Sequence, residues 1–293
     1  MAEWGTILEH LVGGLAVGSI YAAMALGLTL VYGLLRILHI AHAGVYVVGA
    51  FAAYYAYTAT GSFWAALGAA LLASAALGVA IERAFYLPLL DKPRHVPLMI
   101  SIALFLLIEE VVANLFGHYP KGFHVAEFPS GRIVVGGASL RLDSLTVLVV
   151  TLAASLMLWV LLTKTKIGVA SQALIQDPEV AMALGVNMPR IVDLNFVLGS
   201  ALAGFAGLLY GVYYGSISPY MGDVVAYKGL VVIVLGGFGS IMGALLGGLI
   251  LGVAEEFLTA YLGYLLPREA YAFLVLIALL VVRPQGLLGR RES

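Results

Sequence analysis

The sequence predicts an all-α, polytopic membrane protein, with one transmembrane domain over residues 1–293 and about eight spanning helices. The first observation is composition: of the 293 residues, 62% are hydrophobic and only 11% are charged, with a mean hydropathy of +1.03. A soluble domain carries roughly a quarter charged residues. The second is that several apolar runs approach or exceed the roughly 20 residues that a helix needs to cross a bilayer.

The candidate spans follow one another along nearly the whole chain. Leu11–Leu35 contains no Asp, Glu, Lys or Arg, and no basic segment precedes it, so we expect a retained span and not a signal peptide. Ile37–Ile81 is equally free of charge and long enough for two crossings, with a turn at Thr58-Ala59-Thr60-Gly61-Ser62. The remaining spans are Val96–Gly117, Leu145–Thr163, Leu194–Tyr214, Gly229–Ala254 and a short one at Ala270–Val282.

The placement of Lys and Arg predicts the orientation, because positively charged connections stay in the cytoplasm. Of the 15 basic residues, ten fall in one set of alternate connections and five in the other. The larger set places the N-terminus outside and the C-terminus in the cytoplasm. It consists of Arg36, Arg83, Lys92, Arg94, Lys164, Lys166, Arg190, Arg283, Arg290 and Arg291, and the smaller set of Lys121, Arg132, Arg141, Lys228 and Arg268.

This orientation requires an even number of crossings around Gly229–Ala254, since Tyr214 ends outside and the last span must also begin outside. The run is too short for two full helices. We therefore expect a broken or re-entrant helix with its bend at Gly236-Gly237-Phe238-Gly239-Ser240. Non-helical backbone at that depth must be satisfied by protein or by a watery cavity. The alternative is one long tilted helix.

Two connections are long enough to carry structure of their own. Residues 118–144 form the predicted extracytoplasmic loop, where Val125–Phe128 and Arg132–Val135, separated by Pro129-Ser130-Gly131, predict a small hairpin. Residues 164–190 form the predicted cytoplasmic loop. In it Asp177 is placed to cap a helix, Pro178 to begin it and Gly185 to end it, with Val180, Ala181 and Leu184 as one apolar stripe. Such a helix suits docking into a partner's groove, with a position on the lipid headgroups as the alternative.

Several function classes find no support. No GxxxxGK[ST] motif is present, so the chain lacks a Walker A nucleotide site, and the net charge of -1 gives no basic surface for nucleic acid. The absence of cysteine removes disulfides and thiolate metal sites. No loop combines Ser, His and Asp in a catalytic arrangement. We therefore expect no enzyme, no cofactor and no metal site.

Charged and polar residues inside apolar runs are the candidates for function, because they are costly in hydrocarbon and face a bundle interior or water. Glu109 and Glu110 lie within Val96–Gly117, and neighbours on a helix point about 100° apart, so one is expected to line a cavity. For Glu255 and Glu256 an interfacial position near the outer helix end is at least as favoured as a position inside the bundle. His39 and His42 would share a helix face, for which structural hydrogen bonding is favoured over metal binding.

At these residues the chain resembles the permease subunits of branched-chain amino acid ABC transporters and their urea and amide relatives, and most of all the shorter of the two permeases that pair in such transporters. The resemblance covers nearly the whole chain. The blocks that carry it, in order, are Gly18-Ser19-Ile20-Tyr21-Ala22, Leu30-Val31-Tyr32-Gly33, Ile40-Ala41-His42-Ala43-Gly44, Ile81-Glu82-Arg83, Ala181-Met182-Ala183-Leu184-Gly185-Val186-Asn187, Leu235-Gly236-Gly237-Phe238-Gly239-Ser240, Gly243, and Arg283-Pro284-Gln285-Gly286-Leu287-Leu288-Gly289.

The resemblance implies a pore-forming subunit in the inner (plasma) membrane that imports amino acids, branched-chain ones first. Its implied partners are a second permease, two ATP-binding subunits that hydrolyse ATP, and an extracytoplasmic substrate-binding protein. The ATPase would grip a coupling helix made of Asp177, Pro178, Glu179, Ala181, Leu184 and Gly185. The expected translocation path contains His42, Glu109, Glu110, Gly236, Gly237 and Gly239.

Two departures from the family pattern bear on the substrate. The family commonly has Asn at the position of His39 and His-Gly at His42-Ala43, and often a Gln-containing polar pair near Glu109 and Glu110. Carboxylates at these positions favour a substrate that carries an amino group or a positive charge. The rival interpretation is a stand-alone channel or ion-coupled carrier that uses these glutamates and the two histidines as a proton relay.

Overall fold

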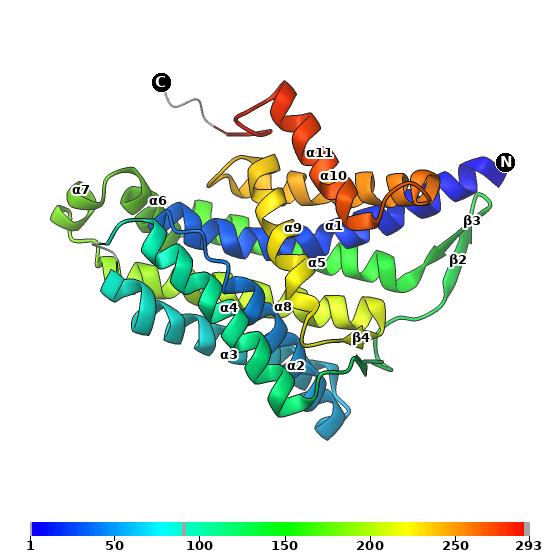
Figure 1. Ribbon diagram of the computed structural model, residues 1–293, viewed down its shortest axis with the longest axis horizontal. Helices are drawn as coiled ribbons and strands as arrows, with labels where there is room; N and C mark the ends of the chain where they lie inside the picture. Colours follow the sequence, from blue (N-terminus) through cyan, green and yellow to red (C-terminus); the bar gives the residue numbers. More distant parts are fainter. Residues whose placement is uncertain (1, 90–91, 290–293) are drawn as a thin grey trace.

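The computed structural model describes residues 2–89 and 92–289, and most of them are helical (Figure 1). In these residues a π-helix at Glu82–Tyr86 and a 3-10 turn at Leu87–Leu89 extend α3, and the strands are β1 (Lys121–Gly122), β2 (Arg132–Val135), β3 (Ala138–Arg141) and β4 (Ser216–Ile217). The α-helices are α1 (Ala2–Leu35), α2 (His42–Thr60), α3 (Phe63–Ile81), α4 (His95–Phe116), α5 (Leu142–Lys164), α6 (Lys166–Gln176), α7 (Pro178–Ala183), α8 (Met188–Tyr214), α9 (Met221–Gly236), α10 (Ile241–Leu262) and α11 (Arg268–Val282).

The predicted all-α, polytopic class is confirmed. Within the described residues six helices are long and apolar enough to cross a membrane, namely α1, α3, α4, α5, α8 and α10. The predicted turn after the second span is also present, since α2 ends at Thr60 and Gly61 adopts a left-handed conformation with φ of 66°. α9 and α11 have only 16 and 15 residues, so they are too short to span a bilayer without tilt or help.

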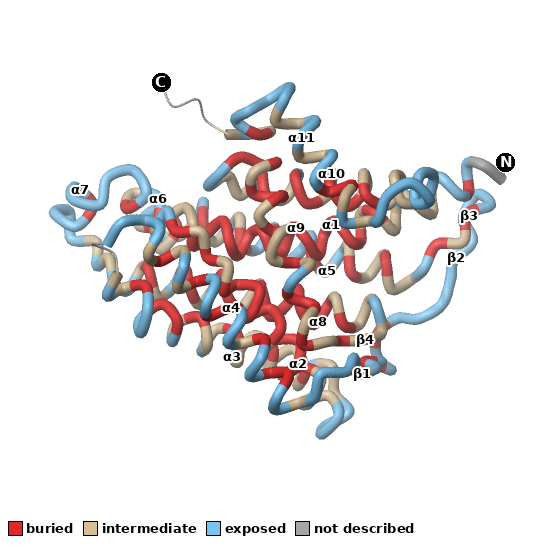
Figure 2. The backbone as a smooth tube through the Cα atoms, in the orientation of Figure 1, coloured by how far each residue is buried: buried red, intermediate tan, exposed pale blue. Residues whose placement is uncertain are grey.

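The core lies along α1 and α8, which the other helices surround. In the most apolar part of α1 78% of residues are buried, and in that of α8 67%, against 28% in α3 and in α5 (Figure 2). α1 packs against α10 through glycines: a Cβ on Gly18 would lie 2.7 Å from the carbonyl oxygen of Gly248, and one on Gly252 would overlap Gly18. Small residues at helix contacts let backbones approach closely. The exposed apolar surfaces of α3 and α5 are those expected to face lipid.

The predicted hairpin exists but uses a different pair of strands. β2 pairs with β3, with Val135 opposite Ala138, across a two-residue turn at Gly136 and Gly137. Both glycines have positive φ, 58° and 88°, which two-residue hairpin turns require. The predicted partner strand Val125–Phe128 instead forms a turn closed by the Phe128 amide and the Val125 carbonyl. The hairpin turn therefore forms at Gly136-Gly137 and not at Pro129-Ser130-Gly131.

The two ends of the bundle carry different secondary-structure elements. Figure 1 shows the N-terminus, β2 and β3 at one end and α6 and α7 at the other. α1 runs from the first end to the second, so its last residues lie near α6. The connection to α2, Arg36–Ala41, is not helical, yet Ile37, His39 and Ala41 in it are buried. The Ala41 amide donates to the Ser101 hydroxyl at 2.9 Å, so α4 satisfies part of this buried backbone.

Candidate functional site

The helix predicted in the loop 164–190 is present with its predicted ends. The Asp177 carboxylate accepts a hydrogen bond from the Val180 amide at 3.0 Å, and Pro178 is the first residue of α7. The helix is closed by the Gly185 amide on the Met182 carbonyl and the Val186 amide on the Ala181 carbonyl, with Gly185 at φ of 91°. Local capping chemistry therefore defines α7 without help from distant contacts.

The apolar residues of α7 do not form one stripe as predicted. Ala181 is 2% exposed and packs inward, whereas Val180 and Leu184 point outward and Leu184 is 80% exposed. The stripe prediction fails because α7 has only six residues and packs on α6 through one face. Val180, Met182 and Leu184 are thus exposed on and just after α7, which lies at the end of the bundle opposite the N-terminus (Figure 1). Exposed apolar patches of this kind mark interaction surfaces.

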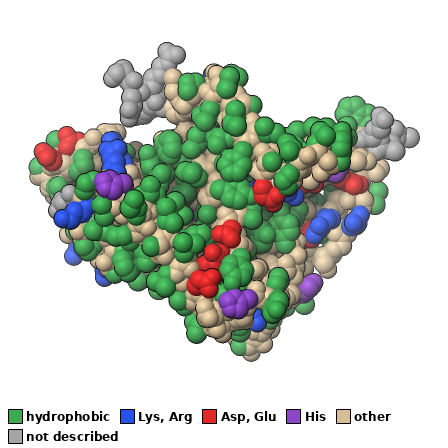
Figure 3. Space-filling model, viewed as in Figure 1, with side chains coloured by type: hydrophobic (Ala, Val, Ile, Leu, Met, Phe, Trp, Pro, Cys, Tyr) green, Lys and Arg blue, Asp and Glu red, His purple; other side chains and the backbone are tan. Residues whose placement is uncertain are grey.

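Three carboxylates gather where the last turns of α4 meet the beginning of α9. Glu109 is 5% exposed and one of its carboxylate oxygens has no hydrogen-bond partner, while Glu110 is exposed, so the two neighbours point apart as expected. Asp223 of α9 lies within electrostatic range of Glu109. Among the described residues none of the three is in a salt bridge. Figure 3 shows acidic side chains gathered on a largely apolar face of the molecule.

His39 and His42 are both fully buried, but they do not share a helix face. α1 ends at Leu35 and α2 begins only at His42, so His39 lies in the non-helical connection. Their rings still lie 5.3 Å apart, and the Nδ1 atom of His39 is 2.7 Å from the Tyr86 hydroxyl. No group of metal-binding side chains is found in the described part of the chain. Structural hydrogen bonding accounts for one ring nitrogen of His39, whereas its other ring nitrogen and both of those of His42 have no hydrogen-bond partner among the described residues.

The predicted break at Gly236, Gly237 and Gly239 separates α9 from α10. A segment near the end of the chain is hydrogen-bonded to the last residues of α9. The amides of Leu287 and Leu288 donate to the carbonyls of Leu235 and Gly236 at 2.8 and 3.0 Å. They satisfy carbonyls that the end of a helix otherwise leaves unpaired. We call residues 283–289 the C-terminal clamp. Two blocks that carried the family resemblance, far apart in sequence, thus form one structural unit.

Sequence analysis missed a buried ionic network that joins four helices. Lys228, assigned to an external connection, lies within α9 and is 2% exposed. Its ammonium group is 2.8 Å from Glu255 of α10 and donates to the Tyr21 hydroxyl of α1 at 2.7 Å. Arg268 of α11 reaches Glu255 at 3.4 Å and Glu256 at 3.2 Å. Glu255 is therefore not interfacial. An isolated lysine in an apolar run was the only signal, and it did not identify a partner.

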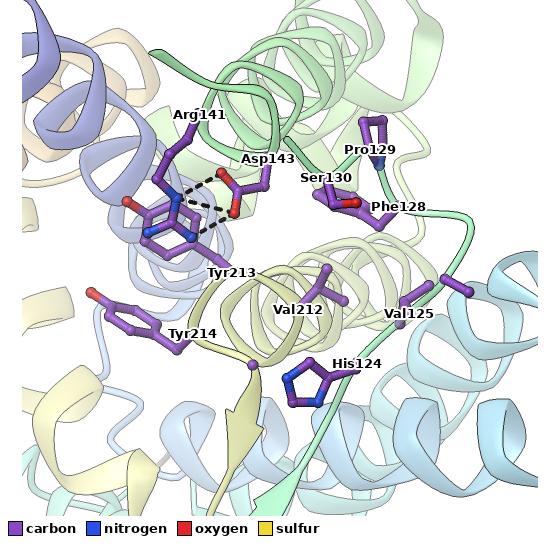
Figure 4. Close-up of a pocket in the computed structure, with 12 residues that line it drawn as sticks. His124, Val125, Phe128, Pro129, Ser130, Arg141, Asp143, Val212, Tyr213 and Tyr214 are labelled. Carbon is purple, nitrogen blue, oxygen red and sulfur yellow. Dashed lines mark hydrogen bonds and ion pairs between the residues drawn. The ribbon is translucent and has the colours of Figure 1, made fainter. Parts of the chain in front are cut away.

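A cavity of about 510 Å³ lies beside the end of α8, next to the loop 118–144 (Figure 4). Its wall is apolar on one side, with Val125, Phe128 and Val212, and polar on the other. There Arg141 lies over the Tyr213 ring, 5.2 Å from its centroid, and pairs with Asp143. This hydrogen-bonded pairing raises the pKa of the Arg141 guanidinium above its ordinary value. The cavity is thus amphipathic and belongs to the predicted extracytoplasmic end.

Comparison with known proteins places these features in one family. Residues 10–283 match the family model described as branched-chain amino acid transport system / permease component. The chain is 35% identical to the high-affinity branched-chain amino acid transport system permease protein LivH of Escherichia coli, over 97% of this chain and 96% of that protein. It is also 35% identical to BraD of Pseudomonas aeruginosa, over 100% and 99%.

One solved structure covers most of the chain at low similarity. PsaBC from Streptococcus pneumoniae, in complex with Fab, aligns with 94% of this chain and 89% of its own, at 15% identity and a TM-score of 0.47. The family rests instead on the sequence matches, which span α7, the α9–α10 break and most of the described helices. The chain belongs to the permease components of branched-chain amino acid transport systems.

Proposed function

We propose that this chain forms one half of the translocation path of an ATP-driven importer of amino acids, branched-chain ones first. A second permease subunit supplies the other half, two ATP-binding subunits hydrolyse ATP, and an extracytoplasmic binding protein delivers the substrate. The substrate assignment is supported by the names of the relatives, which are high-affinity branched-chain amino acid transport permeases. The chain itself needs no cofactor for this role.

The observation that carries the proposal is the exposed face of α7. Its helix is capped at both ends by local bonds, and Val180 and Leu184, four residues apart, are exposed on the same side. An apolar face on a short rigid helix fits a groove in a partner. We assign Asp177, Pro178, Glu179, Ala181, Leu184 and Gly185 to the coupling helix, with Asp177 and Gly185 fixing its ends and Leu184 making the contact.

We place this multi-pass protein in the inner (plasma) membrane with α7 and the C-terminus in the cytoplasm. The bias of Lys and Arg among the connections supports this orientation. Arg290 and Arg291, which contribute to that bias, lie outside the described residues. In this orientation the residues proposed for the path lie at two depths. Glu109 and Glu110 lie toward the outer end of α4, and the break at Gly236, Gly237 and Gly239 lies toward the end of the bundle that carries α6.

Uptake by the assembled transporter in proteoliposomes tests the proposal. Leucine uptake is expected to require the binding protein and ATP, and Leu184→Asp is expected to lower ATP-coupled uptake at least tenfold because it places a charge in the apolar contact. The matched control is Val134→Asp in β2, which is similarly exposed but lies outside the spans, at the other end of the bundle. If Leu184→Asp transports normally while co-purifying with the ATPase, the assignment of α7 is wrong.

The buried carboxylate of Glu109, one oxygen of which has no hydrogen-bond partner, favours an ion-coupled carrier instead. The same vesicles separate the two functions. A carrier takes up leucine on a proton gradient with the permeases alone, whereas the importer stays inactive until ATP and the ATPase are supplied. Leucine uptake driven by the proton gradient alone would therefore show that the chain is a carrier and not part of an ATP-driven importer.

A further inference from the structure

A cavity of about 490 Å³ opens at the end of the bundle that carries α6. It lies where three long helices begin or end, because Tyr32 and Gly33 come from the last turn of α1, Arg94 immediately precedes α4, and Ser240 immediately precedes α10. The cavity uses no residue of the coupling helix and none of the acidic cluster. The full lining is Tyr32, Gly33, Arg36, Arg94, Ile175, Phe238, Gly239, Ser240 and Leu288.

The charge of this cavity is positive and unbalanced. Arg36 and Arg94 both line it, and no acidic side chain is among the lining residues in the described part of the chain. Neither arginine takes part in an ion pair with another described residue. A guanidinium presents several N–H donors in a planar fork that matches a phosphate or a carboxylate. Two such groups at one cavity therefore provide the donors for an anion.

The backbone around the cavity adds to this preference. Among the described residues, Arg36 is the only one other than glycine with a positive φ, which is 53°. This conformation costs free energy and is concentrated at functional sites. The amino end of α10 also faces the cavity through Gly239 and Ser240, and the partial positive charge of a helix N-terminus favours anions. The two arginines and the helix N-terminus at this cavity therefore all favour a negatively charged ligand.

The depth of the cavity indicates where the anion comes from. The apolar part of α1 ends here and those of α4 and α10 begin here, so the cavity lies at the boundary of the hydrocarbon. Tyr32 and Phe238 pack at its edge with ring centroids 4.8 Å apart, and aromatic rings are enriched at that boundary. Exposed Ile175, Phe238 and Leu288 border the cavity and offer apolar contacts for acyl chains.

We propose that this cavity binds the phosphate group of an anionic phospholipid from the leaflet at the α6 end of the molecule. Arg36 and Arg94 hold the phosphate oxygens, the amino end of α10 adds its partial charge, and the acyl chains lie against Ile175, Phe238 and Leu288. The site goes beyond transport and does not depend on which solute the path carries.

Native mass spectrometry of the assembled transporter, purified from membranes that contain phosphatidylglycerol and phosphatidylcholine, tests the site. The wild type is expected to retain phosphatidylglycerol in preference to phosphatidylcholine. The double variant Arg36→Gln/Arg94→Gln is expected to bind it about 30-fold more weakly, from the usual contribution of two basic residues near a membrane surface. The single variant Arg94→Gln, expected to lose about fivefold, serves if the double variant does not assemble.

The matched control is Lys166→Gln/Arg190→Gln, which removes two charges from the same end without touching the cavity. It is expected to retain the lipid as the wild type does. Equal retention of both lipids, or an equal loss in the control, overturns the proposal. Inorganic phosphate added to transporter in phosphatidylcholine nanodiscs forms the second arm. Saturable binding of phosphate there, with no preference for phosphatidylglycerol in the first arm, would assign the cavity to a soluble anion instead.

Discussion

At the scale of single residues, Glu255 shows how a membrane protein keeps charge in its interior. Its carboxylate faces Lys228, Arg268 and the Tyr21 hydroxyl, so a fully buried carboxylate has a positive partner from each of two other helices. Burial of a charge is tolerated when partner and hydrogen bonds are both present. The pair therefore fixes α9 against α10 and α1 near the middle of each contact.

Breaking this pair on one side is expected to destabilise the protein strongly. Lys228→Met leaves the Glu255 carboxylate with only the more distant Arg268, and Glu255→Leu leaves the Lys228 ammonium without its carboxylate, so each is expected to cost about 3–5 kcal/mol. The double variant removes both charges and is expected to cost clearly less than the sum. Thermal unfolding of the purified transporter, arranged as a double-mutant cycle, measures this. Additive losses would show that the two side chains are not coupled.

The acidic cluster leads to a prediction about substrate preference. Glu109→Gln and Glu110→Gln each remove one carboxylate that is outside any salt bridge from the outer part of the proposed path. We expect leucine uptake to remain but its inhibition by lysine and arginine to weaken several-fold, since each unit charge contributes about 1 kcal/mol at this range. Competition assays in proteoliposomes provide the measurement. Glu269→Gln, an exposed carboxylate on α11, is the control, and an unchanged ranking in both test variants contradicts a role in selection.

At the scale of elements, the C-terminal clamp depends on glycines at fixed positions. Gly237 and Gly239 both have positive φ, 95° and 77°, so alanine is strained at either. They differ in their surroundings: a Cβ on Gly237 would overlap the backbone nitrogen of Gly289, whereas one on Gly239 would meet nothing within 4 Å. The two positions therefore separate backbone strain from loss of the clamp.

Gly237→Ala is expected to lower the midpoint of thermal unfolding more than Gly239→Ala does. The second variant carries only the left-handed strain of about 1–2 kcal/mol, while the first also displaces the clamp and leaves the Leu235 and Gly236 carbonyls unpaired. Fluorescence-detected unfolding of the transporter compares them directly. Equal midpoints would mean that the clamp contributes nothing to stability.

Elements defined by local chemistry were predictable, and elements defined by distant contacts were not. The caps of α7, the Gly61 turn and the break near Gly236 follow from residues that lie next to each other in the sequence. The pairing of Lys228 with Glu255 and the docking of Leu287 on Leu235 depend on how helices pack, and no spacing signals them. The hairpin failed for another reason, since the Gly136-Gly137 turn was overlooked in favour of Pro129-Ser130-Gly131.

At the scale of the whole molecule, the two ends carry different structural features. The β2–β3 hairpin and the cavity beside Arg141 lie at one end, and α7 and the cavity beside Arg36 lie at the other. The orientation predicted from Lys and Arg assigns the first end to the outside. Because the chain contains no cysteine, single cysteines can be introduced without a background of reactive thiols.

In intact cells a membrane-impermeant maleimide is expected to label Val134→Cys, on the exposed hairpin, and not Glu179→Cys, on α7. Glu179→Cys is expected to react only after the membrane is permeabilised. The mass shift of the labelled protein on a gel measures the labelling of both variants. Labelling of Glu179→Cys in intact cells would reverse the orientation and remove α7 from the reach of a cytoplasmic ATPase.

The C-terminal clamp also sets an order on biogenesis. Leu287 and Leu288 are translated after all of α10 and α11, yet their amides complete the end of α9, which leaves the ribosome much earlier. Until they arrive, two carbonyls of α9 must be hydrated or bound by the insertion machinery. The end of α9 therefore gains its full set of hydrogen bonds only after α11 has been translated, and a chain stalled within α11 keeps these two carbonyls in water.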